Sequence, residues 1–399
     1  MLKTIFSGKF FLFLWYCLLL AILLPQMFYY IYQVLPFAIF VYTISLLVGI
    51  FILTRFILFF KNSKFVFLIL AFFLLMILSS FWSIKPVTSF SNSFIFILQI
   101  LPVSIFALSF EKPKKLLTNT ALFLSFLGFI MAFFELLLLK WRGLISFSSF
   151  RNNETLGQIS YFLSRLIFGN SNCLAFWLFI TISFTILALI ETKKWKVFLF
   201  FLVPQSIVFF FTFSRATLIA LFGFLFCFFF TLRKKEKLLI FVFLIFIISF
   251  LIGFIGWKNK GIIPTRGISD RVEIWKLGFQ FWKENLILGK GFATSPWLLW
   301  ERVQNVHFHN NFLQIGVELG ILGFLLYLFL WIYPIKIGLR KFNENKMSEN
   351  IIPLAFILSF EFGTFLNSFF ESLITYPPFP FFASIWFFLT TLLINPYFP

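Results

Sequence analysis

The chain has 399 residues, of which 61% are hydrophobic and 12% are charged, and its formal net charge is +19. A soluble domain needs about a quarter of its residues charged, so this composition excludes a soluble globular protein. Successive apolar runs of about 20 residues instead predict membrane-spanning helices. The basic residues lie in short loops between these runs rather than on one soluble face, which argues against a nucleic acid partner.

The apolar runs predict an all-α, polytopic membrane helix bundle of about twelve transmembrane helices. No repeat or low-complexity linker divides the chain, so we expect a single integral membrane domain over residues 1–399. The expected spans lie near residues 8–24, 34–53, 65–81, 90–109, 116–139, 171–190, 197–212, 216–232, 238–256, 312–333, 351–370 and 379–395.

The distribution of lysine and arginine predicts the orientation of the bundle. Short, densely basic loops, such as residues 112–115 and 233–237, are expected in the cytoplasm together with both termini. The opposite, extracytoplasmic face then carries two long segments with more dilute basic residues, near 140–170 and 257–311. These two segments are where the chain can do chemistry outside the lipid core.

The large extracytoplasmic loop, residues 257–311, holds the only aspartate of the chain, Asp270. Asp270 followed three residues later by Glu273 is similar to the start of a capped helix. The sequence predicts that this helix is amphipathic and lies in the membrane interface. Its expected apolar face comprises Val272, Trp275, Phe279 and Trp282, and its expected polar face comprises Lys276, Gln280, Lys283 and Glu284.

Arg215 lies where the expected spans 197–212 and 216–232 meet with almost no loop between them. Its charge should therefore sit at or just inside the outer membrane boundary. A lone charge costs about 2.5–3.5 kcal/mol at the bilayer centre and less toward the boundary. Two interpretations stay open: an arginine that snorkels or pairs with Glu135 or Glu361, and a fixed cation that grips phosphate oxygens bidentately.

His307 and His309 are the two histidines of the chain, and His309 comes just before the expected span 312–333. If a helix begins near His309, three glycines return to its face at about 100° per residue, and small residues let another helix approach closely. These glycines are Gly316, Gly320 and Gly323. The imidazole is then a polar helix cap or a reactive group at a tight helix seam. No third metal ligand stands at a recognisable spacing, so we expect no metal site.

The pattern His309-Asn310, nine residues, Gly320, two residues, Gly323 resembles the signature of the O-antigen ligase and O-antigen polymerase family. Members of this family are polytopic bacterial glycosyltransferases that use lipid-linked glycans on the outer face of the inner membrane. Other elements follow in the family's order over roughly residues 80–335. They are Phe81-Trp82-Ser83, Asn170-Ser171-Asn172, Phe213-Ser214-Arg215-Ala216, and Arg271 with Trp275.

The resemblance implies a donor, undecaprenyl diphosphate carrying a glycan, that is held by Arg215 and Arg271, with Arg266 as the alternative to Arg271. It also implies that His309 orients or deprotonates the acceptor hydroxyl, supported by Asn310 and the three glycines. Fixed cations can stabilise the departing diphosphate, and a neutral histidine can accept a proton near pH 7. We therefore expect an inverting, metal-independent glycosyl transfer without a cofactor.

Ligation of O-antigen to an acceptor of the lipid A-core type is the function that we favour. Chain polymerisation with the same donor stays open, because the residues that carry either reaction look alike. A solute or lipid transporter is the alternative of another class, and the chain lacks the paired, proline-interrupted helices expected of one. The expected partners are the lipid-linked donor, a glycolipid or growing glycan acceptor, and membrane lipids. The expected location is the bacterial inner (plasma) membrane, with the active site on the periplasmic side.

Overall fold

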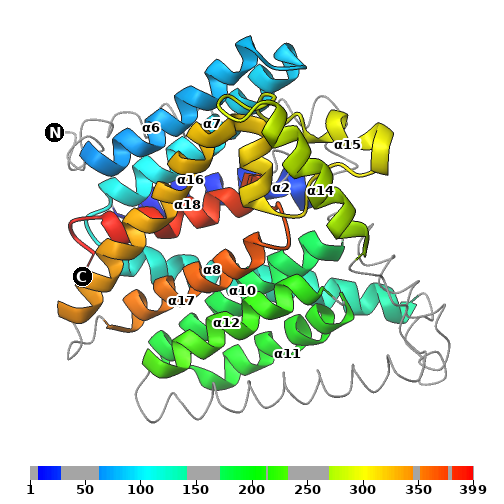
Figure 1. Ribbon diagram of the computed structural model, residues 1–399. Helices are drawn as coiled ribbons and strands as arrows, with labels where there is room; N and C mark the ends of the chain where they lie inside the picture. The colour runs from blue at the N-terminus through cyan, green and yellow to red at the C-terminus, as the bar shows by residue number, and fades with distance from the viewer. Residues whose placement is uncertain are drawn as a thin grey trace. The chain divides into compact units, whose positions relative to one another are not determined.

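A computed structural model describes residues 8–27, 63–141, 171–212, 214–231, 269–344, 351–375 and 380–398 (Figure 1). Every regular element in these ranges is a helix, which confirms the predicted all-α class. Among the described residues, six helices are long and apolar enough to cross a membrane, and three shorter apolar helices accompany them. The chain is therefore a multi-pass membrane protein. The expected spans 34–53 and 238–256 lie outside the described residues, so the total of about twelve stays a prediction.

The described helices group into two compact units. Unit 1 comprises Met1–Pro113, Ile268–Asn345 and Ser368–Pro399, and unit 2 comprises Lys114–Gly267 and Lys346–Asn367. Each unit is described by itself below. The expectation of one domain over residues 1–399 stays a prediction.

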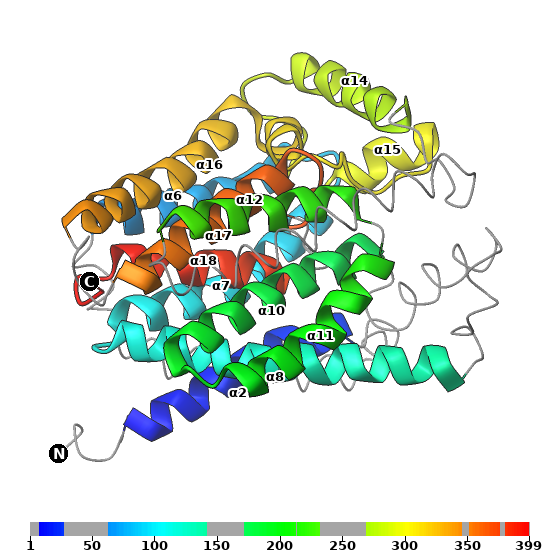
Figure 2. The same cartoon turned by 90° about the horizontal axis from the view of Figure 1, so that it is seen from below.

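Unit 1 contains apolar helices from both ends of the chain, together with α16 and the helices of the large loop. They are α2 (Gly8–Met27), α6 (Ser63–Leu78), α7 (Pro86–Ser109), α14 (Ser269–Glu284), α15 (Ser295–Val303), α16 (Asn311–Glu344) and α18 (Pro380–Ile394). Helix α18 packs against α2, α7 and α16, and α16 also packs against α6 and α14 (Figure 2). Aromatic rings fill this core, with the Trp331 and Trp386 centroids 4.6 Å apart.

Unit 2 is organised around a helix that is buried on every side. It contains most of α8 (Pro113–Trp141), α10 (Ser171–Thr192), α11 (Trp195–Phe211), α12 (Arg215–Thr231) and most of α17 (Ile351–Ser368). The side chains of α10 from residue 173 to residue 190 are buried, because α11 and α12 pack against it. A helix that is apolar all round is typical of such a central position.

Helix α16 is interrupted at Gly320, where φ is 66° and ψ is −164°. Only glycine adopts this backbone conformation readily. The interruption releases backbone groups that the segment 286–291 engages. Three hydrogen bonds join the two segments: Lys290 N donates to Val317 O at 2.9 Å, Gly291 N donates to Glu318 O at 2.8 Å, and Ile321 N donates to Leu286 O at 2.8 Å.

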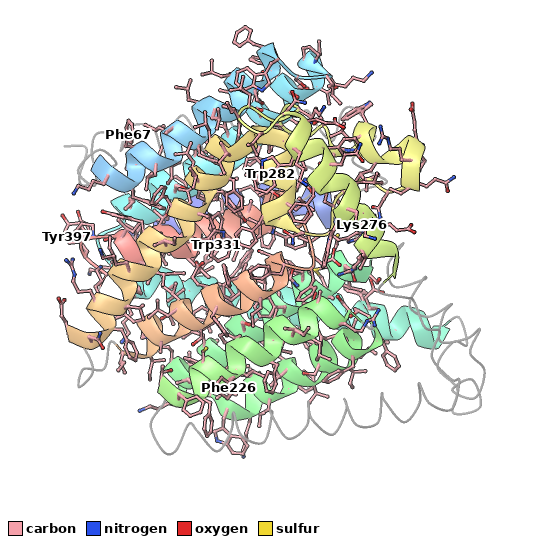
Figure 3. The ribbon with its side chains drawn as sticks, viewed as in Figure 1. Phe67, Phe226, Lys276, Trp282, Trp331 and Tyr397 are labelled. Carbon is pink, nitrogen blue, oxygen red and sulfur yellow. The ribbon has the colours of Figure 1, made fainter. Side chains whose placement is uncertain are left out.

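The three glycines that the sequence singled out all lie in α16, but they have different roles and do not form one smooth packing face. Gly316 leaves room for the indole of Trp282, which a Cβ would approach to 2.7 Å. Figure 3 labels Trp282 on α14, the helix that packs on α16. Gly320 forms the interruption, and a Cβ there would meet the backbone oxygen of Ile287. A Cβ on Gly323 would meet the side chain of Leu319, in the turn before it.

The predicted amphipathic helix is present as α14, but its buried face is rotated from the expected one. Ile274, Gly278 and Phe281 are buried, and Trp275 and Trp282 are partly buried beside them. Val272 and Phe279, which we expected on the same face as the tryptophans, are exposed. The inward face packs against Leu299 of α15 and Leu313 of α16. A location of α14 in the membrane interface stays a prediction. Helix α15 was not predicted, although Pro296 in its first turn is a recognisable start signal.

The interruption of α16 predicts that Gly320→Ala destabilises the protein strongly. The added Cβ meets backbone atoms and forces a left-handed φ on alanine, so neither side can relax without breaking the contact with residues 286–291. The measurement is thermal unfolding of the detergent-purified protein. Gly316→Ala is the matched control, because the atoms nearest its Cβ belong to the indole of Trp282 and its φ is not left-handed, so it adds crowding without backbone strain. Equal melting temperatures for the two variants would contradict the role of the interruption.

Candidate active site

His309 lies in the turn that leads from α15 into α16, and its φ is 51°. Left-handed backbone is uncommon for a residue with a side chain, although histidine is among the more tolerant residues. The next residue caps the helix, since Asn310 Oδ1 accepts a hydrogen bond from Leu313 N at 2.9 Å. His309 is thus positioned by a turn before the helix, and the argument that placed it on the glycine face of α16 is wrong.

Both ring nitrogens of His309 have side-chain partners. Nδ1 lies 3.0 Å from Glu371 Oε2, and Nε2 lies 3.2 Å from Asn305 Nδ2. Asn310, which we expected to orient the imidazole, instead binds the segment that carries Glu371. Its backbone N donates to Ser372 Oγ at 2.9 Å, and its Nδ2 donates to Phe369 O at 3.2 Å.

Glu371 is a fully buried carboxylate that joins His309 to Arg271. Its Oε1 accepts a hydrogen bond from Arg271 Nη2 at 2.6 Å, and Arg271 Nη1 donates to Phe370 O at 2.7 Å. Burial raises the pKa of Glu371. The hydrogen bond with His309 and the charges of the nearby groups lower it by more than burial raises it, so the pKa lies below its ordinary value. Glu371 is therefore a carboxylate whose charge is balanced by Arg271, as a buried charge requires.

His307 is a buried neutral neighbour of His309. The two ring centroids are 4.0 Å apart, and His307 Nδ1 accepts a hydrogen bond from His309 N at 3.3 Å. Burial, followed by the charge of His309, lowers the pKa of His307 to about 3. Its hydrogen bond supports the left-handed backbone of His309.

His307, His309 and Glu371 each offer an atom, and these atoms lie within 4.8 Å of one another. That spacing would suit a metal ion, with Glu371 as the third group that the sequence did not reveal. The three groups are, however, already joined by the hydrogen bonds given above, and Arg271 balances the charge of the carboxylate. We interpret them as a hydrogen-bonded network.

Helix α14 holds this network from one face. Arg271 and Trp275 lie one turn apart on it, and Trp275 Nε1 donates to Phe308 O at 2.9 Å. Arg271 fixes the segment after α17, and Trp275 fixes the histidine turn. The arginine and tryptophan that the sequence singled out thus act as a pair that fastens both segments to α14.

A second set of contacts holds the loop between α14 and α15. Buried Glu318 accepts hydrogen bonds from Ala293 N at 2.9 Å and from Ser295 N at 3.3 Å. Trp82, from the Phe81-Trp82-Ser83 element, donates from Nε1 to Leu288 O at 2.9 Å. Ile84 N also donates to Lys290 O at 3.1 Å, so the segment that follows Phe81 helps to position the loop.

Glu371 and Asn305 are the residues that sequence reasoning missed. Glu371 follows the expected span 351–370 and falls on the predicted extracytoplasmic side. A lone carboxylate at the end of a span, on the same side as the histidines, was the available signal. Asn305 had no signal of its own, because its role depends on the turn that follows α15.

The arginines that we expected to bind the diphosphate are not all placed by the structure. Arg215 is exposed at the first position of α12 in unit 2, where Ser214 O accepts a hydrogen bond from Leu218 N at 3.0 Å. Arg271 belongs to unit 1. Arg266 lies outside the described residues. The expectation that Arg215 and Arg271 together hold the donor therefore stays a prediction.

The burial of His307 predicts acid-sensitive stability. Because the pKa of His307 is lowered to about 3, the unfolded chain takes up the proton first as the pH falls. The stability that neutral His307 supplies is complete above its ordinary pKa and is lost as the pH falls below it toward 3. Melting temperature measured from pH 7 to pH 4 should therefore fall. In His307→Asn, which keeps an acceptor near His309 N, the fall should be shallower, and an equally steep one would contradict this role.

One comparison with known proteins matches the part of the chain that carries Arg271, Asn305 and His309, but not Glu371. The family model described as O-antigen ligase matches residues 198–328, which include Arg215, Arg271, Asn305 and His309. No curated protein matches the chain. The family resemblance predicted from the sequence pattern is therefore confirmed over residues 198–328 of this multi-pass membrane protein, which match the O-antigen ligase family model.

Proposed function

We propose that the protein transfers a glycan from an undecaprenyl-diphosphate donor to an acceptor hydroxyl, with His309 as the general base. The observation that carries this proposal is the hydrogen bond between His309 Nδ1 and the buried carboxylate of Glu371. A carboxylate at one ring nitrogen holds the imidazole in place and leaves the other nitrogen to accept a proton. The family match supports a glycosyltransferase of the O-antigen ligase or polymerase type.

The proposed reaction is a direct displacement. The acceptor oxygen forms a bond to the anomeric carbon while the bond from that carbon to the diphosphate oxygen breaks. The electron pair of the broken bond leaves with the diphosphate, and the proton of the hydroxyl passes to His309 Nε2. The resulting imidazolium is stabilised by Glu371 across a 3.0 Å hydrogen bond. Attack opposite the leaving group inverts the anomeric carbon.

The arginines divide into two proposed roles. Two guanidinium nitrogens of Arg271 donate hydrogen bonds to Phe370 O and to the carboxylate of Glu371, so we assign Arg271 the role of holding Glu371 in place. Arg215, which is exposed at the start of α12, is proposed as the primary cation for the diphosphate, with Arg266 as the second. A guanidinium can grip a phosphate with two parallel hydrogen bonds, which stabilises the charge that develops on the leaving group without a metal.

The proposed location is the bacterial inner membrane with the reaction on its periplasmic side, and ligation to a lipid A-core type acceptor is the favoured reaction. The decisive experiment compares glycans in a deletion strain of the source organism. Loss of long chains on the outer-membrane lipid, with lipid-linked long chains retained, would support ligation. Lipid-linked single units would support polymerisation instead. Unchanged glycans, with transfer of a solute or lipid lost, would contradict both.

Replacement of the base or of its carboxylate should lower the rate of transfer. A general base contributes about a hundred- to ten-thousandfold, so His309→Ala should retain only a residual rate. Glu371→Gln keeps the shape but removes the charge, and a hydrogen bond to a charged group corresponds to about a ten- to hundredfold loss. The measurement is transfer by purified protein in liposomes that contain lipid-linked donor. Glu273→Gln, at an exposed position of α14, removes the same charge and should be near wild type. Wild-type rates for both His309→Ala and Glu371→Gln would exclude this base.

The second prediction concerns the donor. Arg215→Lys keeps the positive charge but loses the planar guanidinium that can donate two parallel hydrogen bonds to a phosphate. Transfer should therefore fall about ten- to a hundredfold. If the guanidinium binds the diphosphate in the ground state, the rate of transfer should fall more at limiting donor concentration than at saturating donor concentration. Arg340→Lys, near the end of α16, is an exposed control with the same chemical change. A wild-type kcat/KM for Arg215→Lys would remove Arg215 from the proposed donor site.

A further inference from the structure

Asn305 lies directly after α15, where Gln304 ends the helix with a left-handed φ of 49°. Its side-chain oxygen stabilises the turn that follows. Oδ1 accepts hydrogen bonds from Val306 N at 2.8 Å and from His307 N at 3.4 Å. On the other side of the amide, Nδ2 lies 3.2 Å from His309 Nε2.

The contacts of Asn305 determine which way its amide points. Because Oδ1 accepts from two backbone N–H groups, the nitrogen must be the atom that faces His309. An amide nitrogen only donates, so His309 Nε2 must accept and cannot carry a proton. The proton of the neutral ring then lies on Nδ1, where it is donated to Glu371 Oε2. The two partners of the imidazole therefore select the same tautomer from opposite sides.

Asn305 and Glu371 differ in how they affect the charge of His309. The charged or titratable groups around the ring are Glu371 after α17, Arg271 on α14 and His307 in the same turn. Glu371 stabilises the neutral ring with a proton on Nδ1, and it also stabilises the imidazolium. The amide of Asn305 discriminates between these forms, because an N–H on Nε2 would face an N–H of Asn305. Only the neutral ring fits both partners.

We propose that Asn305 is a positioning residue that keeps Nε2 of His309 unprotonated, and that the acceptor hydroxyl takes its place at Nε2. This inference rests on the proposed function of His309. A hydroxyl donates to the same lone pair that the amide occupies, so the acceptor finds a ring that is already in the reactive tautomer. Asn305 moves aside as the hydroxyl binds, while Glu371 continues to hold Nδ1.

Three substitutions separate this role from support of the turn. Asn305→Asp keeps an acceptor for Val306 N and His307 N but replaces the donor facing His309 by an oxygen. Asn305→Ala removes the turn acceptor but leaves Nε2 free to accept. Gln304→Glu adds a negative charge at the adjacent exposed residue and serves as the control for charge.

Transfer by Asn305→Asp at pH 7 should fall by more than about tenfold, because the ring is held as an imidazolium between two carboxylates. Its rate should recover partly as the pH rises. Asn305→Ala should lose less than about tenfold, the scale of one neutral hydrogen bond, and Gln304→Glu should be near wild type. A turn-supporting role gives the opposite order. A larger loss in Asn305→Ala than in Asn305→Asp, or no pH recovery in Asn305→Asp, would overturn the proposal.

A spectroscopic measurement tests the tautomer independently of transfer. The chain has only two histidines, so ¹⁵N-histidine labelling gives an assignable spectrum, with His307→Asn used to identify the His309 signals. In the wild type at pH 7, His309 should show a protonated Nδ1 and an unprotonated Nε2, and in Asn305→Asp both should be protonated. A protonated Nε2 in the wild type would overturn the proposal whatever the activity. The expected spectra with no transfer from the lipid-linked donor would support the role of Asn305 and reject the proposed reaction.

Discussion

The buried carboxylate of Glu371 is the constraint on which the arrangement of the candidate site depends. An ionised carboxylate removed from water is stable only when hydrogen bonds and an opposite charge replace its hydration. Arg271 supplies the charge at 2.6 Å and His309 supplies a hydrogen bond at 3.0 Å. Three segments must therefore meet at one point: α14, the turn before α16 and the segment after α17. The same requirement fixes the imidazole in position and orientation.

The interruption of α16 supplies the second constraint. A continuous helix would satisfy its own backbone groups and offer nothing to the loop between α14 and α15. With the helix opened at Gly320, the loop backbone bonds to Val317 and Glu318, and the Glu318 side chain receives Ala293 N and Ser295 N. The α14–α15 segment is thus held to the same helix whose first turn follows His309.

Much of the fold and part of the site could be predicted from the sequence. Apolar length located the apolar helices that the structure describes, usually to within a few residues, because lipid leaves a spanning segment few alternatives. The family resemblance also singled out His309, Asn310, Arg271 and Trp275, which the structure places in or beside one hydrogen-bonded network. Their partners could not be predicted, because Arg271 and Glu371 are 100 residues apart and nothing local joins them. Periodicity misplaced the apolar face of α14 because amphipathic patterning does not tell lipid from protein as the covering material. The same periodicity argument treated Gly320 as a packing residue. A left-handed φ and a close helix contact both select glycine, so the sequence does not distinguish them.

Unit 1 is assembled from three separated stretches of chain, and Glu371 belongs to the last of them. During synthesis, Arg271 and His309 are made and inserted well before their shared carboxylate. Because domains are completed only when their last segment arrives, the ribosome must pass residue 371 before the imidazole gains its orienting partner. A nascent chain interrupted after α16 would contain the histidine turn and the whole family-matched region but would lack the carboxylate that holds the ring. The assembly of the candidate site is thus tied to nearly complete synthesis of the chain, so a partly made chain in the membrane lacks the carboxylate that orients the imidazole.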